Sequence, residues 1–131
     1  MSSYGMSLRD AAKYRGGMNY LAWALHRLTG LGVFLFLGIH IVETFMIVLG
    51  PQAYNDAITT YNTPVFRVME VALLFAVLYH AINGIRVTIQ DLWPTLWRYE
   101  RALIWTSAVL VVGVFVPLAI WGLLPVFRGE L

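Results

Sequence analysis

Six of the ionisable side chains in the long apolar stretches of this sequence are candidates for chemistry. They are His26, Arg27, His40, Glu43, His80 and Arg86. An arginine, lysine or aspartate at the centre of a membrane helix costs about 3 kcal/mol or more, so such residues are rare unless they have a function. We therefore weighed each of them as a candidate for ligand binding or redox chemistry.

His80 and Arg86 have a spacing that suits a haem site. On one helix they lie about 9 Å apart along the axis. A neutral imidazole inside a membrane can ligate the iron, while a guanidinium nearer the surface can pair with the haem propionates. Gly84, one turn after His80, would let a flat macrocycle or another helix approach the main chain. The alternative is an imidazole hydrogen-bonded between helices, beside an arginine whose head reaches the membrane surface.

His26 and Arg27 are adjacent, so on a helix they point about 100° apart and face different neighbours. A quinone head group needs hydrogen-bond donors for its carbonyl oxygens and a route for protons. Arg27, His26 and the nearby indole of Trp23 could supply both. The alternative, which composition alone favours, is a cationic anchor at the membrane surface.

His40 lies much deeper along the first apolar stretch. It follows Arg27 by 13 residues, roughly 20 Å along a helix. Glu43 comes three residues later on the same face, so a pair between these two side chains is one interpretation. Measured from the arginine at the inner end of each helix, His40 and His80 differ in depth by roughly 10 Å. We therefore expect that they do not ligate the same iron.

The elements that position these residues are three long apolar stretches. Of the 131 residues, 60% are hydrophobic and only 12% are charged, against roughly 25% charged in an ordinary soluble domain. A water-soluble core of this size cannot hide so much apolar surface. We predict an all-α integral membrane protein whose membrane domain, 20–131, has transmembrane helices at about 20–49, 64–91 and 102–124. The first loop, 50–63, has room for a short surface helix.

The distribution of basic residues predicts the orientation. One side of the membrane holds Arg9, Lys13, Arg15, Arg27, Arg86, Arg98 and Arg101, and the other holds Arg67 and Arg128. This bias places the N-terminal segment 1–19 in the cytoplasm. The net charge of +2 is too small and too scattered for a nucleic-acid surface. The absence of cysteine excludes iron–sulfur ligation by this chain.

Two motifs occur in order along the chain. Trp23 to Gly30 reads W-A-L-H-R-L-T-G, and Tyr79 to Arg86 reads Y-H-A-I-N-G-I-R. They resemble a His-Arg-x-Ser/Thr-Gly stretch opening the first span and a His-x-x-x-Gly-x-Arg stretch inside the second. This ordered pair is the pattern of the cytochrome b membrane-anchor subunit of succinate dehydrogenase, respiratory complex II. The resemblance covers about residues 20–124; either motif alone is weak, but the ordered pair is strong.

The resemblance implies a haem site on the second helix. His80 corresponds to the family's haem b ligand, and the other axial ligand comes from a second anchor subunit. His26 and Arg86 are expected near the haem propionates. Some relatives hold two haems, and His40 resembles a ligand of the second, so one haem b is expected and two are conceivable.

The resemblance also implies a quinone site. Arg27 corresponds to the arginine that lines the ubiquinone or menaquinone site beside the iron–sulfur subunit. Trp23 departs from the well-known proteobacterial pattern, which has a quinone-site serine at this position. The indole could instead stack on the quinone ring or donate one hydrogen bond.

The implied function is that of the anchor and haem b subunit of a succinate:quinone oxidoreductase, which passes electrons from the iron–sulfur subunit to membrane quinone. The expected partners are a second membrane-anchor subunit, the iron–sulfur subunit, the flavoprotein subunit and lipid of the bacterial cell (inner) membrane. No dicarboxylate or flavin motif occurs here, so succinate chemistry belongs to those partners. Two alternatives stay open: a fumarate reductase anchor, and a structural anchor without haem.

Overall fold

The computed structural model describes residues 17–60 and 63–129, which are helical almost throughout. Three helices are long: α2 (Met18–Phe45), α4 (Pro64–Leu92) and α5 (Glu100–Arg128). The 3-10 turn η1 (Met46–Leu49) extends α2, and α3 (Pro51–Thr60) and η2 (Pro94–Tyr99) form the connections. No strand occurs within the described ranges. The predicted all-α fold is confirmed.

Three segments have the length and hydropathy to cross a membrane. They are Met18–Leu49, Pro64–Leu92 and Pro94–Arg128. The prediction of three transmembrane helices is therefore confirmed, and α3 is the short helix for which the first loop had room. The cytoplasmic placement of the N-terminal segment 1–19 stays a prediction, and its residues 1–16 lie outside the described ranges.

The third helix continues four residues beyond its predicted end at 124. It passes through Pro117 and Pro125 and ends at Gly129, whose φ of 66° is left-handed. A proline removes one main-chain hydrogen bond, but a fully opened turn inside lipid would leave several polar groups unpaired. Pro125 therefore does not stop the helix, although in a soluble protein such a residue commonly marks a boundary.

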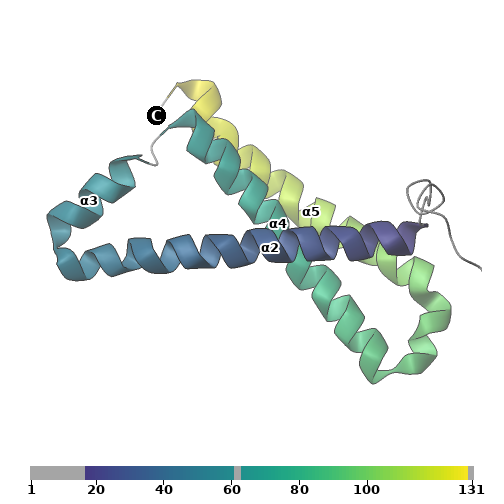
Figure 1. Ribbon diagram of the computed structural model, residues 1–131. Helices are drawn as coiled ribbons and strands as arrows, with labels where there is room; N and C mark the ends of the chain where they lie inside the picture. The colour runs from purple at the N-terminus through teal and green to yellow at the C-terminus, as the bar shows by residue number, and fades with distance from the viewer. Residues whose placement is uncertain (1–16, 61–62, 130–131) are drawn as a thin grey trace, which may run out of the picture.

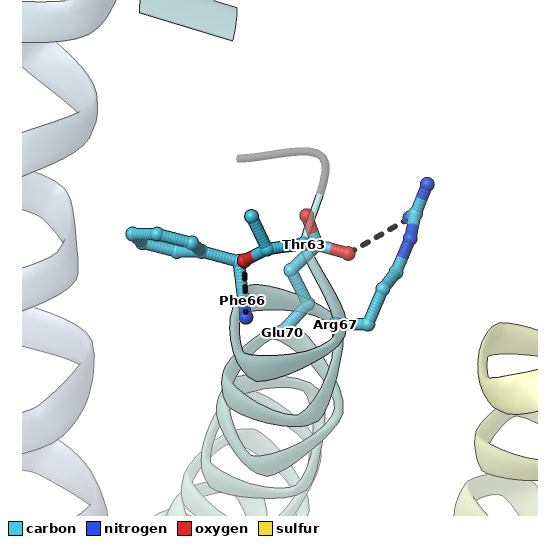
Figure 2. A network of polar contacts seen from close by, with 4 residues as sticks. All are labelled: Thr63, Phe66, Arg67 and Glu70. Atoms are coloured by element: carbon cyan, nitrogen blue, oxygen red, sulfur yellow. Dashed lines mark hydrogen bonds and ion pairs between the residues drawn. The ribbon is translucent and has the colours of Figure 1, made fainter. Parts of the chain in front are cut away.

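The start of α4 follows the usual rules for a helix N-terminus. Pro64 occupies the first turn, where a missing N–H costs nothing, and the Thr63 hydroxyl accepts a hydrogen bond from the Phe66 N–H at 3.5 Å (Figure 2). In the next turn Arg67 and Glu70 form an ion pair at 2.9 Å. Thr63 and Pro64 therefore fix the residue at which the first loop turns back into the membrane.

The helices are arranged as a hairpin crossed by a single helix. α4 and α5 run side by side in opposite directions, and α2 lies across them (Figure 1). The first half of α2 makes the crossing, while its second half leads away from the hairpin to α3, which returns to the start of α4. The α2–α4 crossing is thus the place where residues of the two sequence motifs can meet.

The interior of this chain is small and partly polar. The buried residues among those described are Ala22, Thr29, Asn83, Gln90, Ile104, Val111 and Ala119. Most large apolar side chains of α2 from Phe34 to Leu49 are exposed. Such an arrangement is stable only where lipid or another protein covers the apolar surface, because water would otherwise contact it.

Candidate functional site

The imidazoles of His26 and His80 stack where α2 crosses α4. Their ring centroids are 4.2 Å apart and the ring planes differ by only 7°. One residue comes from each of the two motifs, although 54 positions separate them in the chain. The crossing therefore builds a single site from both motifs.

The orientation of His80 is fixed by the main chain of α2. Its Nδ1 lies 3.1 Å from the carbonyl oxygen of His26. Because a carbonyl oxygen can only accept, Nδ1 must carry the proton, and a neutral His80 then has its lone pair on Nε2. No described residue forms a hydrogen bond with that Nε2. A histidine that ligates a metal typically has this arrangement, with one nitrogen donating to a carbonyl and the other free.

Two glycines make this close crossing feasible. A Cβ at Gly30 would lie 2.8 Å from Cε1 of His80 and 3.1 Å from its Nδ1, nearer than van der Waals contact allows. A Cβ at Gly84 would lie 3.4 Å from Cε1 of His26. Small residues at helix crossings in membranes let main chains approach closely. Gly30 is thus the residue that admits the His80 ring to the surface of α2.

Two hydroxyl groups form further hydrogen bonds near the crossing: that of Tyr79 joins the two helices, and that of Thr29 bonds within α2. The Tyr79 hydroxyl donates to the carbonyl oxygen of Ala22 at 3.2 Å, one turn before His26. The buried Thr29 hydroxyl lies 2.7 Å from the carbonyl oxygen of Leu25 and 3.1 Å from that of His26. Since the His26 carbonyl also accepts from His80, this oxygen is the centre of a small polar cluster.

Arg86 is held beside the histidine pair through a neighbour on its own helix. Its Nε donates to Oδ1 of Asn83 at 3.0 Å, and Asn83 is only 3% exposed. The buried polar atoms of α2 and α4 that lack a partner among the described residues include Nδ1 of His26, Nδ2 of Asn83 and, two turns after Asn83, both side-chain amide atoms of the fully buried Gln90. Native interiors rarely leave so many polar atoms unpaired, which suggests that another group completes this region.

Arg27 faces away from the histidine pair. Its guanidinium carbon lies 4.6 Å from the ring centroid of Trp23, one turn earlier on α2, and both side chains are exposed. Trp23 in turn stacks on Tyr20, with centroids 5.6 Å apart. The expectation that His26 and Arg27 face different neighbours is met, and Trp23 and Arg27 form a second, outward-facing surface.

His40 is not part of either group. It is exposed and its ring stacks on Phe36 with centroids 5.3 Å apart. It forms no ion pair with Glu43, the partner that the spacing suggested, and both residues are within the described part of the chain. Since His40 follows His26 by 14 residues, it lies about 21 Å along α2 from the stacked pair.

Sequence reasoning identified the histidines and arginines but missed two residues of the site and one buried polar residue farther along α4. Gly30 was named only as part of a motif, and Asn83 and Gln90 were not considered. Gly30 follows His26 by one turn on the same face, and that spacing was the available signal. No signal in the sequence distinguishes the buried Gln90 from a surface glutamine.

Comparison with known proteins decides the family. The model of a family described as "Succinate dehydrogenase/Fumarate reductase transmembrane subunit" matches residues 8–116. The chain belongs to this family. The resemblance drawn from the two motifs is thereby confirmed.

Two curated relatives agree. The chain is 39% identical over 104 residues to the succinate dehydrogenase 2 membrane subunit SdhC of Mycobacterium tuberculosis, which covers 79% of this chain and 76% of that protein. It is 30% identical over 98 residues to the succinate dehydrogenase hydrophobic membrane anchor subunit of Halobacterium salinarum, covering 71% of this chain and 75% of that protein. The anchor subunit described here therefore matches its relatives over most of both lengths.

Gly30→Ala tests the crossing geometry of this anchor subunit. The added methyl group would displace the His80 ring and break its bond to the His26 carbonyl, at a cost of about 1–3 kcal/mol, the usual range for overpacking. The thermal unfolding midpoint of the purified protein in detergent, followed by circular dichroism, should fall.

Gly32→Ala is the matched control. It lies on the same helix two residues later, and a Cβ there meets nothing within 4 Å. Its unfolding midpoint should stay level or rise slightly, because alanine favours helix more than glycine does. Equal midpoints for the two variants would contradict the packing described at Gly30.

Proposed function

We propose that this membrane-anchor subunit binds a haem b through His80 and passes electrons from an iron–sulfur subunit to quinone in a bacterial cell membrane. The observation that supports it most is the His80 imidazole, whose Nδ1 is tied to the His26 carbonyl while Nε2 is left without a described partner. In that complex the flavoprotein subunit oxidises succinate, and a second anchor subunit lies beside this one.

The residues around His80 fit a haem. An iron–imidazole bond would lie in the plane of the ring, whereas the ring of His26 covers a face of the His80 ring and so does not lie along the direction of that bond. The close approach at Gly30 and Gly84 sets the ring against a main-chain surface and limits its rotation. Bound there through His80, haem b would supply a one-electron carrier inside the membrane.

His26 and Arg86 fit the propionate edge of such a haem. Arg86 uses Nε to bond Asn83, which orients the guanidinium and leaves its terminal nitrogens for a carboxylate. His26 has a buried Nδ1 that lacks a partner among the described residues. A carboxylate placed between the two would satisfy both groups.

Arg27 and Trp23 fit a quinone head group at the membrane boundary. Both are exposed near the N-terminal end of α2, and neither contacts the stacked histidine rings through an interaction among the described residues. The guanidinium can donate to a quinone carbonyl oxygen, and the indole on which it rests offers a flat apolar surface and one further N–H. Arg27 points about 100° away from His26 around α2, so the quinone would approach a different side of this helix from the haem.

The first functional prediction concerns His80→Ala. Because the alanine cannot ligate iron, the purified complex should lose the b-type absorbance in its reduced-minus-oxidised spectrum, while subunits still assemble to a measurable extent. An unchanged spectrum in assembled complex would refute ligation by His80.

The second prediction concerns His40→Leu and the number of haems. His40 contacts only Phe36 through its ring and has no carbonyl or carboxylate that orients it among the described residues, unlike His80. Haem content per complex, measured as the pyridine haemochrome, should be unaltered. Loss of about half of the haem would instead identify His40 as the ligand of a second haem.

The third prediction separates quinone chemistry from succinate oxidation. Arg27→Leu removes the charged donor, and charge-assisted hydrogen bonds contribute roughly 1.5–3 kcal/mol, so quinone reductase activity should fall by about tenfold or more. Succinate oxidation by an artificial acceptor, which takes electrons before the membrane subunits, should change little. Equal losses in the two assays would indicate failed assembly and leave Arg27 as a surface anchor.

A further inference from the structure

The end of the α4–α5 hairpin farthest from the histidine pair contains two adjoining hollows. One, of about 370 Å³, is lined by Arg67, Trp121, Gly122, Leu124, Pro125 and Arg128. The other, of about 300 Å³, shares Arg67, Trp121 and Gly122 and extends past Glu70 and Val71 to Leu74 and Leu118. Both volumes are in the range of small-molecule sites. Arg67 precedes His80 by 13 residues, about 20 Å along α4, so these hollows are separate from the proposed haem site.

The hollows combine a charged rim with an apolar wall. Arg67 stands in the second turn of α4 and Arg128 is the last residue of α5, so both cations lie where the two helices reach the membrane boundary. Towards the membrane centre the wall consists of aliphatic side chains and Trp121. Its floor is the contact between the helices at Gly122, where a Cβ would lie 3.4 Å from Cγ2 of Val71.

The charge at the rim is not balanced by the described residues. Glu70 pairs with one terminal nitrogen of Arg67 at 2.9 Å, and Figure 2 shows the rest of that guanidinium extending away from the helix. The other two nitrogens of Arg67 form no hydrogen bond with a described residue, and Nε is buried. Arg128 has no ion pair with any described carboxylate. Two arginines and one glutamate leave the rim with a net charge of +1.

We propose that this site binds an anionic phospholipid, with the headgroup phosphate between Arg67 and Arg128 and an acyl chain along the aliphatic wall. Guanidinium groups bind phosphate oxygens through paired hydrogen bonds, and a single negative charge neutralises the rim. The acyl chain of a lipid can pack along the apolar wall beside the two cations. A free phosphate has no apolar part that could use this wall. Trp121 at this depth fits the boundary between headgroups and chains.

The binding experiment uses the full chain in its purified, lipid-depleted complex. Dioleoyl phosphatidylglycerol and dioleoyl phosphatidylcholine are titrated separately, and native mass spectrometry counts the lipid adducts. Phosphatidylglycerol should bind this site more tightly. Arg128→Gln should weaken its binding about fivefold, the effect of one cation near an anionic lipid surface. Arg67→Gln should weaken the binding of phosphatidylglycerol to the same extent. The charge-matched control is Arg101→Gln at the other end of α5, which should leave this binding unchanged.

Glu70→Gln should affect the binding of phosphatidylglycerol in the opposite direction. It frees Arg67 and raises the rim charge by one, so phosphatidylglycerol should bind about fivefold more tightly. A merely structural role of the Arg67–Glu70 pair would not produce tighter binding. Because Arg128→Gln and Glu70→Gln both leave Arg67 in place, the test survives if Arg67→Gln fails to fold.

Two results would overturn the proposal. One is equal binding of phosphatidylglycerol by the parent protein, Arg128→Gln and Glu70→Gln. The other is displacement of the lipid by inorganic phosphate alone, since that would show a site for a free anion that does not use the aliphatic wall. Loss of haem in the His80 variant has no bearing on either result, so this site and the proposed function fail separately.

Discussion

At position 30 of α2 the absence of a side chain lets the His80 ring reach the main chain of a neighbouring helix. The resulting bond between Nδ1 of His80 and the carbonyl oxygen of His26 fixes three things together. It holds α2 across α4 at one register, it stacks the two imidazoles, and it leaves Nε2 as the nitrogen with a lone pair. A larger residue at position 30 would alter all three.

This one contact matters because lipid provides few other means of holding helices together. Apolar side chains gain little by leaving lipid for another helix, so close packing and interhelical hydrogen bonds determine the arrangement. The Tyr79 hydroxyl adds a second interhelical bond, to the carbonyl oxygen of Ala22 one turn earlier on α2. Beyond that region the second half of α2 leaves the hairpin and exposes its apolar side chains, in a place where a second anchor subunit could pack.

The sequence was sufficient for the elements and for the chemistry of single residues. Hydropathy predicts the three spans because each is a continuous apolar run, and the two motifs predict the family because their order and spacing are specific. What the sequence could not provide is the register between helices: that the ring of His80 lies against Gly30, or that Gln90 is fully buried, depends on contacts between residues distant in the chain. The third span is predicted at about 102–124, whereas α5 continues through Pro125 to Arg128, because an opened turn inside lipid would leave main-chain polar groups unpaired.

The central claim is that the stacked histidines prepare His80 to ligate a haem. The most direct test is the haem content of the unmodified complex, purified with this subunit and measured as a pyridine haemochrome. The account predicts protohaem, the b-type haem, at about one per copy of this chain, with a low-spin spectrum typical of two axial nitrogen ligands. A fully assembled, quinone-reducing complex with no haem would contradict it and leave the histidine pair as a structural contact between two helices.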